Sequence, residues 1–323
     1  MRRIMGGSGL ILVLGLLVYW GLWEQAPKVY RVGVLHFTNN NLPTLEGFKE
    51  GMRKLGYVEG EQIHYLFEGA AQDIDMLQPM AQRLVSQKPD LIFASTTPAT
   101  LMAKKKAASI GIPVVFAPVN DPIATGVLND LRHPGGDITG VRLGNSDPKR
   151  LTWLLKVDPS IKTVLVPFNA TDSSALTTLK KVRIVAKQVG VELLEVPVTS
   201  AAEVTAVIKN FPPRSDAIFL PRDGLVMSRI KDFSKAAIQH KVVLSTPRYK
   251  QVEAGALMGF GFRGYDLGKQ AARMADQILR GARAGDLPVE TGEDYLFINL
   301  RTARAIGLQV PSQVLRSAYQ VIQ

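Results

Sequence analysis

The feature that most constrains the fold of this chain is a regular alternation of predicted strands and helices. Residues 29–36 are apolar enough for a buried strand, and residues 42–55 follow with apolar side chains at helical spacing. The same pair recurs at 91–94 and 98–110, so one strand-plus-helix unit takes about 25–30 residues. Such alternation is typical of βαβ units on a parallel sheet.

A Pro/Gly-rich stretch at 133–136 interrupts the alternation, which restarts with a strand at 163–168 and continues to a long amphipathic helix at 265–279. The sequence therefore predicts an α/β fold with two doubly wound parallel-sheet lobes, joined by a hinge near residues 142–147. The length of 323 residues fits two domains of ordinary size.

The N-terminal segment predicts a membrane helix. Arg2 and Arg3 precede an apolar run from Ile4 to Trp23, and the next charge is Glu24. About 20 apolar residues suffice to span a bilayer, and the positive end stays inside. We therefore expect residues 1–27 to anchor the protein to the inner (cell) membrane and the rest to be periplasmic or otherwise extracytoplasmic. A cleaved signal peptide is the open alternative.

The distribution of charge and the absence of cysteine argue against nucleic-acid binding and against sites that need a thiol. The chain has 39 Lys+Arg against 28 Asp+Glu, a net charge of +11, but the basic residues are scattered and the densest run is 104–106. Without an aromatic-interleaved basic stripe, a basic surface near an anionic membrane is favoured and no nucleic-acid partner is expected. The absence of cysteine excludes disulfides, thiolate metal sites and a cysteine nucleophile.

Polar side chains gather where the predicted strands end. In open α/β sheets, ligands bind beyond the carboxyl ends of the strands. The same residue types also cap helices, so each has a purely structural alternative. The candidate ligand-binding residues are Phe37, Thr38, Thr96, Thr97, Asp121, Phe168, Ser173, Ser174, Arg222, Asp223 and Thr246.

Motifs for catalysis are missing. The sequence has no G-x-S-x-G elbow outside the N-terminal segment, no phosphate-binding G-x-x-x-x-G-K-[ST] and no H-E-x-x-H. Residues 259–264 match G-x-G-x-x-G in letters, but they fall at the end of a predicted strand rich in aromatics. We therefore expect no enzyme activity, no cofactor and no bound metal.

Several segments together resemble the ABC-type substrate-binding proteins that include binders of tryptophan and other aromatic amino acids. The segments that carry the resemblance include Gly47-Phe48-Lys49-Glu50-Gly51, Asn120-Asp121-Pro122, His133-Pro134-Gly135-Gly136-Asp137-Ile138-Thr139-Gly140-Val141 and Tyr265-Asp266-Leu267-Gly268. The resemblance covers about residues 29–311 and implies the type I periplasmic binding protein fold. It further implies three crossovers, with lobe 1 at 28–142 plus 250–288 and lobe 2 at 143–249 plus 289–323.

The resemblance also implies cleft positions for Thr38, Thr96, Thr97, Asp121, Asp223 and Thr246. The chain departs from the family pattern at several sites. An Asn-Ser pair is replaced near Ser173, a Thr is Arg222, a Tyr is Phe168 and a Gln is Asn39. An aromatic amino acid ligand therefore does not transfer directly, and Arg222 would suit a more anionic ligand.

We therefore expect an extracytoplasmic protein that captures a small polar, amino-acid-like solute by hinge closure and presents it to an ABC permease. Asp223 would hold a ligand cation, Thr96 and Thr97 an anionic group, and Phe37 and Phe168 an apolar portion. A membrane-anchored sensory or regulatory subunit with a sensor partner is the first alternative, and a tethered enzyme the second.

Overall fold

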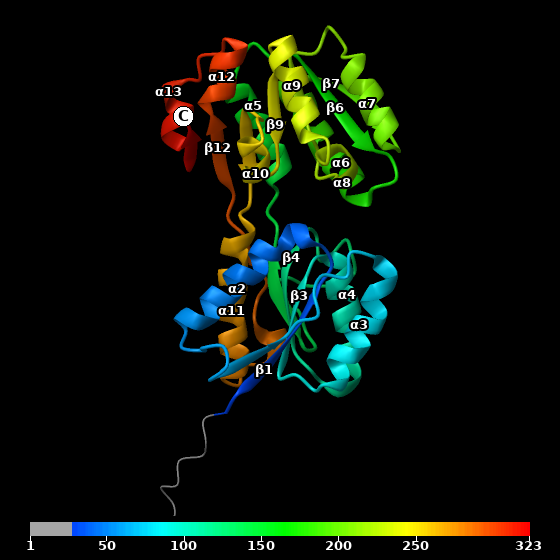
Figure 1. The fold of residues 1–323 in the computed structure, drawn as a ribbon, viewed down its shortest axis with the longest axis vertical. Helices are drawn as coiled ribbons and strands as arrows, with labels where there is room; N and C mark the ends of the chain where they lie inside the picture. The colour runs from blue at the N-terminus through cyan, green and yellow to red at the C-terminus, as the bar shows by residue number, and fades with distance from the viewer. Residues whose placement is uncertain (1–27) are drawn as a thin grey trace, which may run out of the picture.

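The computed structural model describes residues 28–323, except the side chains of Ser173 and Ser174, and it consists of two lobes (Figure 1). Each lobe is built on one sheet. The first sheet has the order β11-β5-β4-β3-β1-β2, and the second has the order β13-β12-β10-β9-β8-β6-β7. The predicted two-lobe α/β architecture with mainly parallel sheets is confirmed.

The first lobe is formed by residues from two separate parts of the chain. Its strands are fully parallel to one another, and β3 and β4 are buried along their whole length. Its elements are β1 (Tyr30–His36), α2 (Leu42–Lys54), β2 (Ile63–Leu66), α3 (Ile74–Ser86), β3 (Leu91–Ser95), α4 (Thr97–Ala107), β4 (Val114–Val119), β5 (Ile138–Arg142), α11 (Gly264–Leu279) and β11 (Glu290–Thr291), with short 3-10 turns at Asn39–Asn41, Ala108–Ile110 and Ala284–Asp286.

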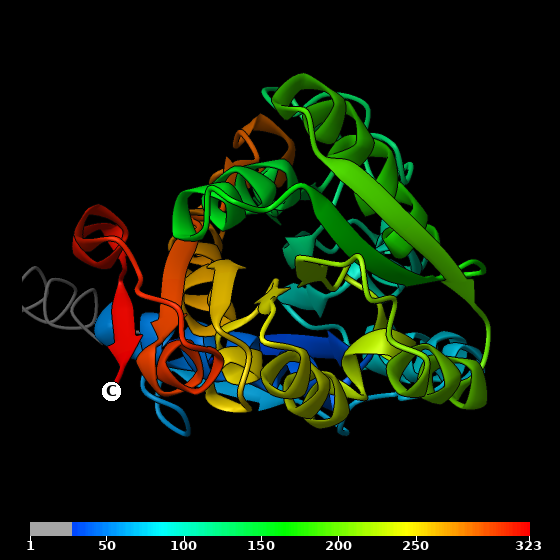
Figure 2. The ribbon, with the colours of Figure 1, turned by 90° about the horizontal axis from the view of Figure 1, so that it is seen from above.

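The second lobe has the same layered construction, with helices on both faces of its sheet and β13 at one edge (Figure 2). Its elements are α5 (Ser146–Val157), β6 (Thr163–Asn169), α6 (Ser173–Val189), β7 (Glu192–Val198), α7 (Ala201–Lys209), β8 (Ala217–Phe219), α8 (Gly224–Met227), α9 (Ile230–His240), β9 (Val243–Thr246), α10 (Tyr249–Glu253), β10 (Met258–Gly261), β12 (Tyr295–Asn299), α12 (Leu300–Ile306), α13 (Ser312–Ser317) and β13 (Gln320–Ile322).

Three crossovers connect the lobes, at about residues 142–145, 262–263 and 292–294. The predicted boundaries at 249/250 and 288/289 are therefore wrong. Residues 250–261 stay in the second lobe because β10 pairs in parallel with β9, and β11 stays in the first because it pairs with β5. Strand periodicity does not reveal which sheet a strand joins, since pairing is a contact between distant segments.

One pair of neighbouring strands in the second sheet departs from the predicted parallel arrangement. β10 and β12 are antiparallel, whereas β12 and β13 are parallel to each other. The connectivity explains this reversal, because β10 runs toward the first lobe and leaves by the second crossover. β12 enters the second lobe by the third crossover and therefore runs in the opposite direction.

The first lobe is completed by close packing of two helices that lie far apart in the sequence, α2 and α11 (Figure 1). Glycines permit this approach. A Cβ atom on Gly47 would lie 1.9 Å from the carbonyl oxygen of Tyr265, and one on Gly268 would lie 2.0 Å from the carbonyl oxygen of Thr44. The glycines therefore allow α11, from the second part of the chain in this lobe, to pack directly against α2.

The predicted membrane anchor at residues 1–27 lies outside the described residues. None of the helices found in residues 28–323 combines the length and the apolar character that crossing a bilayer requires.

Candidate functional site

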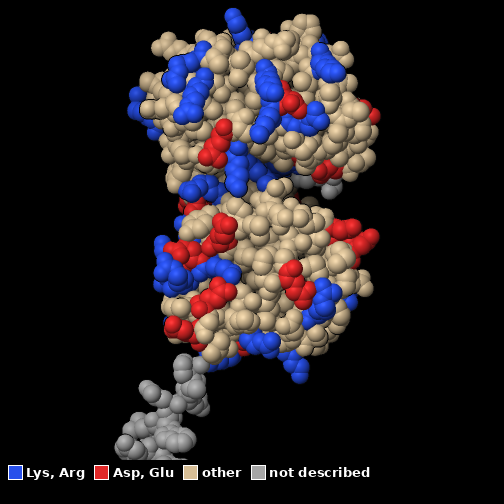
Figure 3. All heavy atoms as spheres, in the orientation of Figure 1, with Lys and Arg blue, Asp and Glu red and all other residues tan. Residues whose placement is uncertain are grey.

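The carboxyl edges of the two sheets face each other across the crossovers. β5 leads from the first sheet into the first crossover, and β10 leads from the second sheet into the second crossover. Because β1, β3 and β4 are parallel to β5, and β6, β8 and β9 are parallel to β10, all their carboxyl ends point toward the other lobe. In Figure 3 the molecule narrows between the lobes, and Lys and Arg side chains gather at this waist. These two edges form the candidate site.

The first strand of the first lobe is followed by a short capped turn. The hydroxyl of Thr38 accepts a hydrogen bond from the backbone N–H of Asn40 at 3.3 Å, which begins the 3-10 turn Asn39–Asn41. Phe37 is half-buried and packs against the first-lobe core. Both residues thus have structural roles at this edge, and both remain partly accessible.

Thr96 occupies an unusual position after β3. Its φ of 86° and ψ of 157° lie where β-branched residues are rare, and such strain clusters at functional sites. Its hydroxyl is buried without a hydrogen-bond partner, and no side chain caps α4, which begins at Thr97. The first turn of α4 therefore presents uncapped backbone N–H groups beside a free hydroxyl.

Asp121 follows β4 and forms a bridge between the two lobes. One of its carboxylate oxygens accepts a hydrogen bond from the backbone N–H of Ala124 at 3.1 Å. The other lies 3.7 Å from the Nζ of Lys181 on α6. About a third of each of the two side chains is exposed, so this ion pair is a surface contact across the gap between the lobes.

The structure gives Asp223 a structural role at the end of β8. Its side chain is fully buried, and one oxygen accepts a hydrogen bond from the N–H of Val226 at 3.0 Å, which caps α8. The other oxygen accepts a hydrogen bond from the N–H of Asn169 at the end of β6. Burial raises the pKa of Asp223, against the effect of these two hydrogen bonds. Asp223 is thus occupied as a helix cap that ties β6 to α8.

Four other predicted residues, Phe168, Thr246, Ser173 and Ser174, belong to the second lobe. Phe168 is only 7% exposed and packs in the core of the lobe. Thr246 is fully buried, and its hydroxyl donates a hydrogen bond to the carbonyl of Met258 at 3.3 Å. Ser173 and Ser174 begin α6, but their side chains lie outside the described part of the chain.

Arg222 belongs to a group of residues that we call the arginine cluster, formed by Arg222, Arg248 and Phe262. Arg222 follows β8, Arg248 follows β9 and Phe262 follows β10, and these three strands are neighbours in the second sheet. Both guanidinium groups lie over the ring of Phe262, at 5.3 Å for Arg222 and 5.8 Å for Arg248. These distances are within the range of cation–π interactions.

Arg222 of the arginine cluster is held in place by a buried ion-pair network centred on Asp147. One oxygen of Asp147 accepts hydrogen bonds from Arg222 Nε at 2.9 Å and from Thr178 at 3.2 Å. The other accepts one from Arg150 Nη2 at 3.2 Å. Burial opposes ionisation of Asp147, but the charges of Arg222 and Arg150 outweigh it and hold the pKa of this carboxyl below its usual value.

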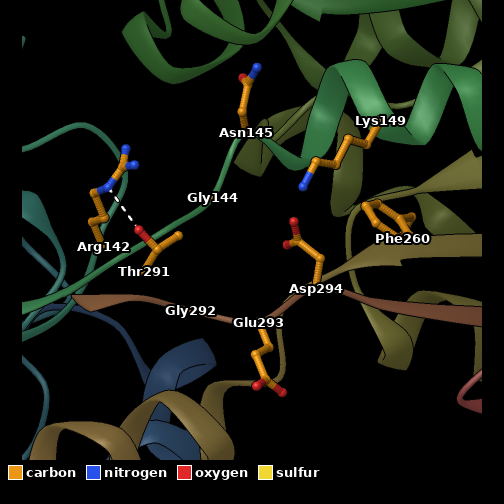
Figure 4. Close-up of a pocket in the computed structure, with 9 residues that line it drawn as sticks. All are labelled: Arg142, Gly144, Asn145, Lys149, Phe260, Thr291, Gly292, Glu293 and Asp294. Carbon is orange, nitrogen blue, oxygen red and sulfur yellow. Dashed lines mark hydrogen bonds between the residues drawn. The ribbon is translucent and has the colours of Figure 1, made fainter.

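A cavity of about 460 Å³ lies at the hinge, lined by Arg142, Gly144, Asn145, Lys149, Phe260, Thr291, Gly292, Glu293 and Asp294 (Figure 4). In Figure 4 the Lys149 side chain points toward Asp294, and Arg142 donates a hydrogen bond to Thr291 at 3.1 Å. The hydroxyl of Ser146 donates to Asp294, and burial raises the pKa of Asp294. Since two crossovers form its walls, the shape of this cavity depends on the angle between the lobes.

Sequence reasoning missed Arg248, Phe262 and Asp147 as site residues. Arg248 stands two residues after the end of β9, and this position is the signal that could have identified it. Asp147 carried no such signal, because its partner Arg222 is 75 residues away in the chain. Within residues 28–323, no group of three or more His, Asp or Glu side chains is placed to hold a metal ion.

The family described as ABC transporter substrate binding protein matches residues 32–322. A tyrosine-binding protein of Clostridioides difficile is 29% identical over 265 residues, which cover 82% of this chain and 76% of that protein.

Two solved structures resemble both lobes. A domain of a Streptococcus pneumoniae ABC protein in complex with L-Trp superposes with a TM-score of 0.81 at 26% identity, covering 91% of this chain and all of that one. A ligand-free, open substrate-binding protein with adhesive properties from Clostridium difficile gives a TM-score of 0.77 at 28% identity, with the same coverage.

Proposed function

The chain belongs to the ABC transporter substrate-binding proteins, and from that premise we propose that it is the extracytoplasmic solute-binding component of an ABC-type importer. It would capture a small polar, amino-acid-like solute between the two lobes and present it to a permease. The observation that carries this proposal is the pair of facing sheet edges, which bring the free hydroxyl of Thr96 and the arginine cluster to the same gap. Similarity to proteins that bind tyrosine and L-Trp supports a solute of that size.

The mechanism follows from contacts on both lobes. A solute that touches Thr96 on one lobe and Arg222 on the other binds the closed arrangement more tightly than the open one. It therefore shifts the equilibrium toward closure by the difference in its affinity for the two states. The crossovers at 142–145, 262–263 and 292–294 are the segments that bend. Attachment to the membrane through residues 1–27 stays a prediction from the sequence.

Thermal unfolding in the presence of amino acids and small carboxylates tests the proposal. At a solute concentration near 100 times Kd, binding stabilises the folded protein by about 2.7 kcal/mol, which raises Tm by several degrees. Thr96→Val keeps the shape of the side chain and removes the free hydroxyl, so the shift should shrink. Thr205→Val on α7, where the side chain is partly exposed, is the matched control and should leave the shift intact. A panel without any shift counts against a solute-binding role.

A further inference from the structure

The arginine cluster contains more positive charge than its surroundings neutralise. Both oxygens of Asp147 are engaged, one with Arg150 and the other with Arg222. The guanidinium of Arg248 makes no hydrogen bond or ion pair with any residue in the range 28–323, and its contact is the ring of Phe262. In addition, Nη2 of Arg222 is buried without a partner, on a side chain that is 9% exposed. Two guanidinium groups thus retain unused donors at one place.

Burial of these two guanidinium groups lowers the stability of the folded protein unless a group of opposite charge pairs with them. An unpaired charge in a poorly hydrated site costs free energy, and the pKa of Arg248 is lowered to about 10 by burial and by the charge of Arg222. Arg248 nevertheless remains protonated at neutral pH. Planar guanidinium groups with free donors match the two oxygens of a carboxylate, and such charge-assisted pairs are among the stronger hydrogen bonds.

The carboxylates near the same gap are already used. Asp223 caps α8, Asp121 pairs with Lys181, and Asp294 accepts a hydrogen bond from the hydroxyl of Ser146. An amino acid carries an ammonium group, and a carboxylate is its strongest protein partner. Unpaired hydroxyl oxygens of Ser95, Thr96 and Ser245 lie at the sheet edges, but the carboxylates named above already have partners. The described residues of the two edges therefore offer unused cationic donors to an anion, but no unpartnered carboxylate to an ammonium group.

We propose that the solute is an organic anion without an ammonium group, and that its carboxylate binds Arg222 and Arg248 over the ring of Phe262. This inference rests on the proposed function and narrows the solute from amino-acid-like compounds to carboxylates of net negative charge. Arg248 is the better residue to test, because Arg222 also holds Asp147 and its replacement would disturb the buried network.

The experiment is isothermal titration of the full chain with matched pairs of solutes. Each pair shares a ring and a carboxylate and differs in the ammonium group: L-phenylalanine with 3-phenylpropionate, L-tyrosine with 3-(4-hydroxyphenyl)propionate, and L-tryptophan with indole-3-propionate. Succinate and benzoate extend the panel to other carboxylates. Arg248→Gln removes the charge, and Arg304→Gln on the exposed face of α12 is the control.

We expect at least one anion to bind more tightly than its amino acid partner. Arg248→Gln should weaken that binding by about tenfold to a hundredfold, and Arg304→Gln should leave it unchanged. Tighter binding of the amino acid, or equal affinity of the anion for Arg248→Gln and the wild type, overturns the inference while the proposed function stands. Absence of binding across the whole panel counts against the proposed function itself.

If no solute of the panel binds, Tm of the ligand-free protein still tests the role of Arg248. The Arg248 guanidinium has no counter-ion among residues 28–323, so Arg248→Gln should leave Tm of the ligand-free protein unchanged or raise it. A Tm lowered by several degrees, with Arg304→Gln unchanged, would assign Arg248 a structural role and overturn the anion site.

Discussion

Replacement of Asp147 by asparagine tests the buried network that holds Arg222 in place. Asparagine keeps the shape of the side chain and removes its charge. Arg150 is fully buried and Arg222 is 9% exposed, so neither guanidinium can turn to water when the carboxylate is lost. The variant thus leaves two buried charges without their shared counter-ion.

The expected loss of unfolding free energy in Asp147→Asn follows from the burial of both guanidinium groups. Removal of one partner from a buried ion pair costs about 3–5 kcal/mol, because the remaining charge is left uncompensated. The equilibrium constant for unfolding should therefore rise by roughly two to four powers of ten. Urea unfolding measures this as a lower midpoint with an unchanged m-value.

The pH dependence of the unfolding free energy provides a second test of the Asp147 network. Because the pKa of Asp147 is held below its usual 3.8, this carboxyl stabilises the folded state above that pH and loses its contribution as the pH falls through the folded-state pKa. The difference in unfolding free energy between wild type and Asp147→Asn should therefore be full at pH 7. It should shrink steadily once the pH drops below about 4.

Asp232→Asn is the matched control, since Asp232 forms a surface pair with Arg229 in which both side chains are at least a third exposed. It should cost about 1 kcal/mol or less. The reasoning would be refuted if Asp147→Asn cost no more than Asp232→Asn, or if its cost did not change between pH 7 and pH 3.

Two further predictions concern packing and the contact between the lobes. Gly47→Ala places a Cβ 1.9 Å from the Tyr265 carbonyl oxygen and should lower the unfolding free energy by about 1–3 kcal/mol in urea unfolding. Gly224→Ala meets no atom within 4 Å and should cost little, so equal losses would contradict the packing argument. Lys181→Gln removes the ion pair with Asp121 and should increase the radius of gyration of the ligand-free protein at low salt in X-ray scattering. At about 1 M salt, where the screening length is near 3 Å, wild type and variant should coincide, and a difference that persists there would argue against an electrostatic contact.

Much of the architecture could be predicted from local sequence patterns. The apolar runs that became β1, β3 and β4 are contiguous, and the helices between them carry their apolar residues at helical spacing. Such periodicity depends on neighbours within a few residues, so it is readable in the chain. The sheet to which 250–261 belongs was not readable, because it depends on pairing between β10 and β9 across a loop.

The candidate site, like the fold, could be predicted from the sequence only in part. Polar residues at strand ends identified Thr96 and Arg222 correctly as residues of the facing edges, since strand direction in a parallel sheet places them there. The use of each side chain was not predictable. Asp223 was expected to bind a ligand cation, but its oxygens are taken by two backbone N–H groups that come from β6 and α8.

The sequence by itself determined the order of strands and helices and the chemical types that reach the edges of the sheets. Only the tertiary structure decided which of those polar groups are consumed internally and which remain for a solute. Arg222 and Arg248 are 26 residues apart, and their proximity over Phe262 exists only because β8, β9 and β10 are adjacent. A buried polar group must find its partner wherever the fold places one, so its satisfaction is a property of the folded chain.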